Sequence, residues 1–327
     1  MHWISLPISA ILLTVAVGSA SRVKRVIGGI EFEEGKWPWL VSLQGKIPDF
    51  TIFGIPITYR KFYCGASLIN DRWILTAAHC FKENDLGPGL VGLVYIKVNG
   101  IEQQLTDKVL RPNYWHARLG DIELSADLVD RLVGLVGDFF DISRLREWTL
   151  HGEKIVIHPE YNSENLWAND IALVKLEEDV PSGSELLSHI QSVHLPVQGL
   201  MTFPRDMQKC IMKGWGCTAG GGSVASVARE VELPKVSDLS CRQFWNVPAT
   251  TRLCAGYNLQ QKGICSGDSG GPLVCNTGDS WVQVGIASFT SANRPGNVPG
   301  VFTRVSQFTD WIQQVIMEDE RNQQDES

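Results

Sequence analysis

Short runs of β-branched and aromatic residues, separated by turn residues, recur through most of the chain. Clear examples are residues 39–43, 73–75, 154–157, 171–176 and 282–288. Many short strands at this spacing predict an all-β protein built as a barrel or a sandwich. No internal repeat accompanies the strands.

Three other stretches have a different character. Residues 181–206 carry prolines and few strand signals, so we interpret them as a linker between two halves. Residues 305–317 have apolar side chains at helical spacing (Phe308, Ile312 and Val315), which predicts a terminal helix. The polar residues 318–327 are expected to fray.

Two further segments, 81–113 and 125–148, fit the strand pattern poorly. The first is long and loop-like, and the second has apolar residues at roughly helical spacing. We interpret both as surface insertions, the second with room for a short helix.

The composition is that of a globular protein. The 327 residues are 44% hydrophobic and 20% charged, enough apolar material for one large domain or two smaller ones. The formal net charge of −7 gives no reason to invoke nucleic acid or an anionic membrane as a partner.

The first residues have the features of an export signal. Residues 4–17 are mostly apolar, and Gly18, Ser19 and Ala20 place small residues before a cut after Ala20. The apolar run is short for a membrane span, so residues 1–20 are predicted to be a signal peptide, with an uncleaved anchor as the alternative. We therefore expect a secreted, extracellular protein with no membrane anchor once the signal is removed.

A processing site follows the expected signal. Arg22, Lys24 and Arg25 immediately precede Val26-Ile27-Gly28-Gly29. Cleavage after Arg25 would remove a propeptide, residues 21–25, and free the ammonium group of Val26. The basic pattern resembles a furin-type convertase site, although a trypsin-like activating protease could use the same arginine.

Three local motifs carry groups that could perform acyl transfer. They are Thr76-Ala77-Ala78-His79-Cys80, Asn169-Asp170-Ile171-Ala172-Leu173 and Gly267-Asp268-Ser269-Gly270-Gly271-Pro272. A serine hydroxyl needs a base such as an imidazole to accept its proton, and the base needs a carboxylate to fix its tautomer. His79, Asp170 and Ser269 can be given those roles on chemical grounds, although each motif taken singly has a structural explanation.

Together, these motifs and their chain order resemble the chymotrypsin–trypsin family of serine proteases. The resemblance extends from Val26 to about Met317, the expected protease domain, and includes further segments of the chain. These are Trp37-Pro38-Trp39, Cys64-Gly65-Ala66-Ser67-Leu68-Ile69, Gly214-Trp215-Gly216, Leu253-Cys254-Ala255-Gly256-Tyr257 and Pro299-Gly300-Val301-Phe302-Thr303. The resemblance implies two six-stranded antiparallel β-barrels with a C-terminal helix and an active site in the cleft between the barrels.

The resemblance also implies roles for single residues. His79 is the expected general base, Asp170 orients it, and Ser269 attacks the substrate. The backbone N–H groups of Gly267 and Ser269 would form the oxyanion hole, and Ser288 would support the buried aspartate. The new Val26 ammonium would pair with Asp268, so the precursor is expected to be a zymogen with little activity.

Eight cysteines in an exported chain suggest disulfides. The resemblance implies three of them, Cys64–Cys80, Cys210–Cys275 and Cys241–Cys254. Cys265 matches half of a fourth family bridge but lacks its usual partner in 291–295, and Cys217 has no usual counterpart in the family. In the family fold, the loop that carries Cys217 runs close to the segment before the nucleophile. A Cys217–Cys265 bridge is therefore predicted, with two free thiols or an intermolecular bond as the alternatives.

The substrate pocket is interpreted from Gly263, Thr290 and Gly300. Family members that cut after Arg or Lys usually carry an aspartate where this chain has Gly263, and burying a cation without a counter-charge is costly. Thr290 should narrow the entrance, Ile264 adds an apolar wall, and Gly300 is expected to leave the deep end roomy. These features favour cleavage after small to medium apolar residues, as in elastases, with a chymotrypsin-like or trypsin-like preference as the alternatives.

Three loops depart from the family pattern: 47–61, 81–113 and 125–148 are long. We expect them to rim the cleft and restrict access, with neutral surface variation as the alternative. Asp121 and Glu123 lie near the family's calcium loop, but the insertion weakens that parallel, so no metal or cofactor is predicted.

The expected partners are protein or peptide substrates, an activating protease and protease inhibitors. The alternative from another functional class is a catalytically silent secreted homologue that only binds. Such homologues usually lack a triad member, whereas this chain has all three.

Overall fold

The N-terminal part of the chain contributes six strands, β2 to β7, which form one closed barrel. The computed structural model describes residues 27–53, 55–82, 110–124, 148–180 and 189–326. In order around the barrel, the strands are β2 (Leu40–Ile52), β3 (Ile55–Leu68), β4 (Trp73–Thr76), β7 (Ala172–Leu176), β6 (Trp148–Ile157) and β5 (Trp115–Leu119). Strands β4 and β7 are buried at every position because they lie between the barrel interior and the rest of the molecule.

The C-terminal half forms the second barrel. Its strands are β8 (Lys209–Gly214), β9 (Arg229–Val236), β10 (Arg252–Ala255), β13 (Gly300–Arg304), β12 (Trp281–Phe289) and β11 (Pro272–Asn276). Pairing of β8 with β9 closes the barrel, and the short β1 (Ile30–Glu31) adds to the open edge of β9. The prediction of two six-stranded antiparallel barrels is confirmed.

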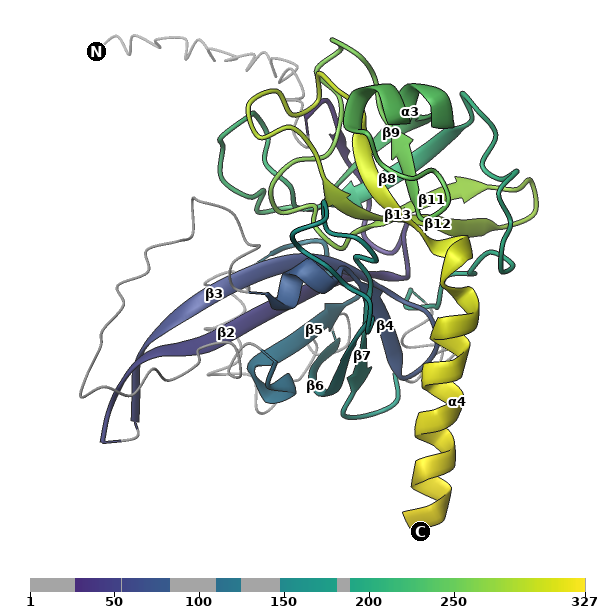
Figure 1. Ribbon diagram of the computed structural model, residues 1–327. Coiled ribbons are helices and arrows are strands. Elements are labelled where there is room, and N and C mark those ends of the chain that lie inside the picture. Colours follow the sequence, from purple (N-terminus) through teal and green to yellow (C-terminus); the bar gives the residue numbers. More distant parts are fainter. Residues whose placement is uncertain (1–26, 54, 83–109, 125–147, 181–188, 327) are drawn as a thin grey trace, which may run out of the picture.

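The two barrels stack with their linker along one side (Figure 1). The described part of the expected linker, 189–206, contains no strand and runs across both barrels. Its Val193 N–H donates to Leu68 in the first barrel, and Gln283 of the second barrel donates its N–H to the carbonyl of His194. The linker therefore holds the barrels against each other.

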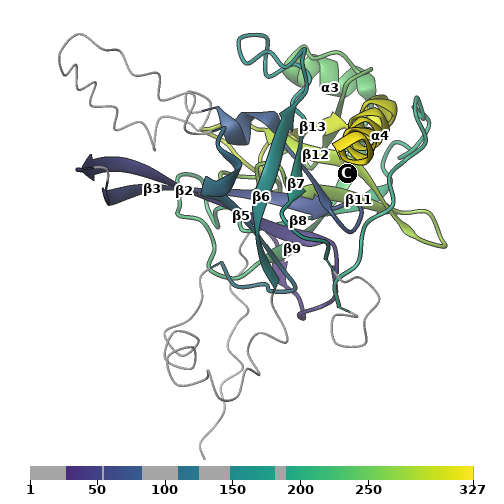
Figure 2. The ribbon, with the colours of Figure 1, turned by 90° about the horizontal axis from the view of Figure 1, so that it is seen from below.

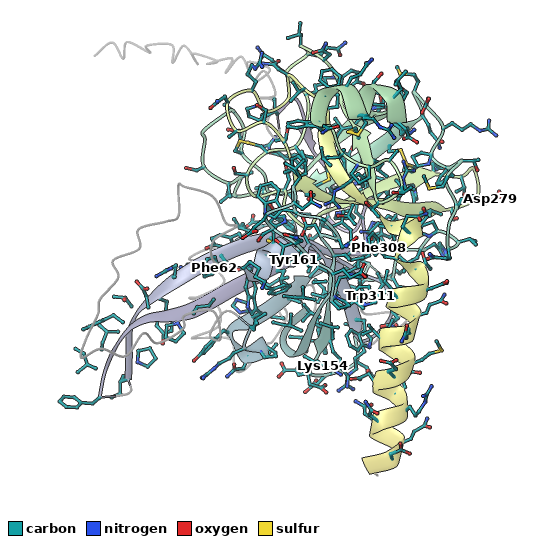
Figure 3. All side chains as sticks on the ribbon, in the orientation of Figure 1. Phe62, Lys154, Tyr161, Asp279, Phe308 and Trp311 are labelled. Carbon is teal, nitrogen blue, oxygen red and sulfur yellow. A yellow bond between two sulfur atoms is a disulfide. The ribbon has the colours of Figure 1, made fainter. Side chains whose placement is uncertain are left out.

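The terminal helix is longer than predicted. A 3₁₀ turn, η7 (Val305–Gln307), leads into α4 (Thr309–Glu326), so the prediction that residues 318–327 fray is wrong for 318–326. Asp319 is buried there, and its two carboxylate oxygens lie 2.7 Å from the ammonium groups of Lys154 and Lys175. These charge pairs hold the polar end of the helix on the first barrel, where Figure 3 shows Lys154 facing α4.

A second helix, α3 (Asp238–Trp245), was not predicted. The side chain of Ser237 caps its first turn by accepting the N–H of Ser240, and Asn246 ends it in a left-handed conformation with φ of 51°. Eight residues give too few turns for a clear apolar period, which explains why the sequence pattern missed this helix.

The segment 47–61, interpreted from the sequence as a long loop, is instead regular β structure. Strands β2 and β3 continue their pairing out to Ile52 and Ile55, so the segment is the outer half of one ribbon. Figures 1 and 2 show this ribbon projecting from the first barrel in both views. The alternating β-branched and aromatic residues of the segment explain why it extends the strands.

Several predictions concern residues outside the described ranges. These are the signal peptide 1–20, the propeptide 21–25, Val26, and most of the insertions 81–113 and 125–148. Among the helices that are described, none combines the length and the apolar character needed to cross a membrane.

Candidate active site

His79 lies at the end of the first barrel that faces the second barrel. It belongs to the 3₁₀ turn η1 (Ala78–Phe81), two residues after β4 ends. The disulfide between Cys64 of β3 and Cys80 fixes this turn, with a distance of 6.4 Å between the two Cα atoms. The whole residue is 5% exposed, so most of the imidazole is shielded from solvent.

Asp170 is fully buried beside that imidazole, just before β7. Its Oδ2 lies 2.8 Å from Nδ1 of His79, and its Oδ1 accepts the backbone N–H of His79 at 2.9 Å. The hydroxyl of Ser288, from β12 of the second barrel, donates to Oδ2 at 2.5 Å. Both barrels thus supply groups that hold one carboxylate and, through it, one imidazole.

The charge state of Asp170 follows from this environment. Burial raises the pKa of the carboxyl, but the charge of His79 and the hydrogen bonds from His79 and Ser288 outweigh burial and hold the pKa below its ordinary value. Asp170 therefore stays ionised near neutral pH, which favours the tautomer of His79 that carries its proton on Nδ1.

Ser269 lies on a loop that touches the first barrel. The N–H of Gly65, next to the Cys64–Cys80 bridge, donates to the carbonyl of Ser269 at 2.7 Å. On the other side, the N–H of Gly270 donates to Ala287 at 2.8 Å, next to Ser288. The Ser269 side chain is half-buried and makes no hydrogen bond within the described residues, so the structure does not join its hydroxyl to His79.

The backbone before Ser269 presents two free donors. Within the described residues, the N–H groups of Gly267 and Ser269 donate to no protein group. Gly267 has φ of +97°, and a Cβ there would lie 3.2 Å from Cα of Gly216 and 2.7 Å from a methyl group of Val224. Only glycine suits this turn, and N–H groups without a protein acceptor are what an oxyanion hole requires.

Asp268 stands between these donors and is fully buried. Its carboxylate accepts the backbone N–H groups of Gly216 and Cys265, each at 2.9 Å. Burial, which outweighs these two hydrogen bonds, raises the pKa of Asp268 to about 7. No cation pairs with the carboxylate among the described residues, and its expected partner Val26 lies outside them.

The structure has all four expected disulfides. Cys210–Cys275 and Cys241–Cys254 lie in the second barrel, and Cys217 pairs with Cys265, with their Cα atoms 5.4 Å apart. This last pairing was left open by the sequence. Since Cys265 also donates its N–H to Asp268, the bridge ties the loop after β8 directly to the segment before Ser269.

The expected pocket residues come together, but the deep end is not roomy. Ile264 is buried, and a Cβ on Gly300 would lie 2.6 Å from its side chain, so Ile264 fills the space that Gly300 leaves. Gly263 is also buried, and its N–H donates to Ile27 at 3.1 Å. Thr290 is half-buried, with its hydroxyl lacking a partner among the described residues.

Sequence reasoning missed Trp167, beside His79, and Arg252, which holds the backbone of Trp167. The rings of Trp167 and His79 are 6.0 Å apart, and Trp167 and Leu166 have φ of 51° and 48°, both left-handed. The buried guanidinium of Arg252, from the second barrel, donates to the carbonyls of both residues. Arg252 thus holds this strained loop against His79, a contact across 85 residues of sequence that no local pattern could predict.

Asp121 and Glu123, which lie near the family's calcium loop in the sequence, make contacts with protein groups instead. Asp121 Oδ2 lies 2.6 Å from the guanidinium of Arg118, and its Oδ1 accepts the N–H of Glu123. Among the described residues, no cluster of three or more His, Cys, Asp or Glu side chains could hold a metal ion.

Comparison with known proteins agrees with the family resemblance of the motifs. A family model described as Trypsin matches residues 26–129 and 124–312. Two curated proteins, both called transmembrane protease serine 7, from Mus musculus and Homo sapiens, are each 31% identical to the chain over 301 residues. The alignments cover 91% of this chain but only 29% of each relative, so the chain spans less than a third of their length.

Proposed function

Because the chain belongs to the trypsin family, we propose that it is a serine endopeptidase with Ser269 as its nucleophile. The observation that carries the proposal is the buried carboxylate of Asp170, which two barrels position at 2.8 Å from Nδ1 of His79. A structural histidine needs no such arrangement, whereas a general base needs its tautomer fixed.

The proposed reaction has two halves. Ser269 Oγ bonds to the peptide carbonyl carbon while its proton passes to Nε2 of His79, and the N–H groups of Gly267 and Ser269 stabilise the oxyanion. The C–N bond then breaks as His79 returns the proton to the leaving amine. Water hydrolyses the acyl-enzyme by the same steps, with His79 again as base and then acid.

The test uses protein cleaved after Arg25 and profiled on a peptide library beside Ser269→Ala. We expect cleavage by the first protein and a loss of at least about 10⁴-fold in the variant. No cleavage, despite an authentic Val26 terminus, would contradict the proposal and favour the binding-only alternative. Trapping of Ser269 by a fluorophosphonate, with mass spectrometry of the adduct, separates an unsuitable library from an inactive site.

We also infer export and activation by cleavage. The apolar start of the chain, the basic residues before Val26, and four disulfides support a secreted zymogen. The proposed partners are protein substrates, an activating convertase or trypsin-like protease, and protease inhibitors. Sequencing the N-terminus of protein secreted by cultured cells tests this; a terminus other than Ser21 or Val26 would contradict it.

For specificity, we propose cleavage after small to medium apolar residues. Ile264 and Gly300 support this choice, because the isoleucine side chain occupies the end of the pocket that a Phe or Leu side chain would need. None of the pocket residues Gly263, Ile264 and Thr290 carries a carboxylate that could pair with a buried Arg or Lys side chain of the substrate.

Ile264→Ala is expected to enlarge the pocket. Since each methylene in an apolar pocket changes discrimination by about tenfold or more, the ratio of kcat/KM for Phe over Ala substrates should rise at least about tenfold. Val197→Ala, at an exposed site far from the pocket, is the matched control. The ratio is independent of how much enzyme is folded, so an unchanged ratio would contradict the role of Ile264.

Arg252→Met is expected to release the loop that carries Leu166 and Trp167. Two charge-assisted hydrogen bonds are lost, each worth about 1.5–3 kcal/mol, and His79 loses the support of the Trp167 ring. We expect kcat/KM to fall about tenfold to a hundredfold, together with faster amide exchange at 166–169. Arg242→Met, on the exposed face of α3, controls for loss of a cation; equal behaviour of the two variants would contradict the role of Arg252.

A further inference from the structure

The outer half of the β2–β3 ribbon has no role in the site described above. Strand β5 pairs with β2 only from Val41 to Gly45, and β4 pairs with β3 only at Ser67 and Leu68. Among the described strands, residues 46–52 and 55–61 pair only with each other, and Figures 1 and 2 show the ribbon leaving the barrel. Seven residues per strand, at about 3.3 Å each, project roughly 20 Å.

The end of the ribbon carries exposed apolar side chains between residues 50 and 59; we call these side chains the apolar tip. Of the 16 large hydrophobic side chains that are exposed in the described part of the chain, six lie there: Phe50, Ile52, Phe53, Ile55, Ile57 and Tyr59. Phe53 is 100% exposed. A contiguous apolar patch on a projecting element marks an interaction surface rather than ordinary surface variation.

Cations lie directly behind the apolar tip. Lys46 and Lys61 are exposed and are direct cross-strand partners, and Arg60 follows beside them; we call the three the cationic collar. Like charges placed opposite each other destabilise a strand pair. Arg60 is paired with Asp49 at 2.5 Å, but within the described residues no carboxylate pairs with either lysine. The collar is therefore suited to an anionic partner.

The ribbon's open edges disfavour a partner that adds a strand. Pro48 and Pro56 have no N–H to donate, and the β2–β3 register shifts between Pro48 and Phe50 and again between Phe50 and Thr51. Prolines, lysines and bulges at an edge all block strand addition. A second copy meeting tip to tip would also bring two cationic collars together. The side chains of the tip, rather than its backbone, must therefore make the contact.

We propose that the apolar tip and cationic collar dock this protein on an anionic lipid bilayer. The three residues Phe50–Ile52 on one strand, with their partners on the other, give an apolar depth of about 10 Å, which matches the 5–10 Å that interfacial segments enter. Lys46 and Lys61 then lie roughly 13 Å further along the strands than Phe50, from where their long cationic side chains can extend toward the lipid headgroups.

The overall charge of −7 does not predict this contact, because the attraction is local. Charges more than about 10 Å away are largely screened at physiological salt, and the collar lies on a projecting ribbon.

Docking also has a geometric consequence. Gly65 of β3 contacts Ser269, and ten residues of the same strand separate Gly65 from Ile55 at the end of the tip. With about 10 Å of the ribbon inserted, this spacing sets the catalytic loop roughly 20 Å above the bilayer.

Vesicle flotation tests the proposal with the full secreted chain carrying Ser269→Ala, which prevents self-cleavage. We expect the protein to float with vesicles of phosphatidylcholine and phosphatidylserine at 7:3, and at least tenfold less with phosphatidylcholine alone. Phe53→Ser/Ile55→Ser should reduce binding at least tenfold, and Lys46→Glu/Lys61→Glu should reduce it similarly and remove its dependence on salt. Because all four side chains are exposed, these variants are expected to fold.

Matched variants keep the test specific. Val197→Ser/Leu259→Ser removes two exposed apolar side chains elsewhere, and Arg205→Glu/Arg321→Glu reverses two exposed cations elsewhere; both should bind vesicles as the parent does. No flotation with anionic vesicles, or equal flotation of tip and control variants, would overturn the proposal. If the parent does not bind vesicles, and the same tip substitutions made with Ser269 intact slow cleavage of a protein substrate, the ribbon is a protein-docking element and the bilayer proposal is wrong.

Discussion

Asp170→Asn is expected to lower kcat/KM about 10⁴-fold, as the equivalent substitution does in the trypsin triad. The carboxylate accepts the backbone N–H of His79 on one oxygen, and Nδ1–H and the Ser288 hydroxyl on the other. An amide has one acceptor oxygen only. If that oxygen stays on the backbone N–H, the new NH₂ faces Nδ1 and forces the proton onto Nε2. The imidazole can then no longer accept the Ser269 proton.

This prediction is measured on purified, cleaved protein with a short chromogenic peptide, beside two further variants. Asp279→Asn, on the exposed turn between β11 and β12 that Figure 3 labels, should leave kcat/KM unchanged. Ser288→Ala removes one of the donors to Asp170, so we expect a smaller loss of about tenfold. Activity of folded Asp170→Asn within tenfold of the parent would show that His79 does not work as the general base.

The fold was predictable where the information is local. Runs such as 171–176 specify a strand by themselves, and the ordered motifs around His79, Asp170 and Ser269 indicate the barrel pair. The terminal helix shows where local information ends. Its last turns are polar, and the charges that stabilise them, Lys154 and Lys175, lie more than a hundred residues earlier in the chain.

The same limit applies to the site. The roles of His79 and Asp170 could be read from their motifs, because family resemblance carries long-range geometry that a single sequence does not. Arg252 has no motif around it, and its contacts with the 166–167 carbonyls exist only once both barrels have formed. The pocket shows a third case: Gly300 was visible in the sequence, but its packing against Ile264 was not.

The second large effect is expected at Asp268. The precursor and the cleaved protein should differ in kcat/KM and in free energy of unfolding, and the difference in unfolding free energy should depend on pH. We infer that cleavage after Arg25 supplies the Val26 ammonium as its partner. Arg25→Gln should prevent this and leave kcat/KM at least about 10²–10³-fold lower, because losing one member of a buried charge pair costs about 3–5 kcal/mol. The measurement compares the Arg25→Gln precursor with the cleaved parent on the same peptide.

The pH dependence of stability distinguishes two explanations for an inactive precursor: the missing Asp268–Val26 pair, and a propeptide that only blocks the active site. In the precursor, burial raises the pKa of Asp268 from 3.8 to about 7, so between these pH values the folded chain holds a proton that the unfolded chain has lost. Its free energy of unfolding should therefore fall by on the order of 4 kcal/mol as pH rises from 4 to 7, and this group should add no further change above pH 7.

Pairing with Val26 should remove that loss in the cleaved form, since an ammonium lowers the pKa of the carboxyl. Chemical unfolding at pH 4 to 8, with Ser269→Ala in all proteins, should therefore give a stability gap between cleaved and uncleaved forms that widens up to pH 7. Asp268→Asn in the precursor should remove the part of the pH dependence of the unfolding free energy that Asp268 contributes. A gap that stays constant with pH, or that persists in Asp268→Asn, would show that Asp268 is not the group that senses cleavage.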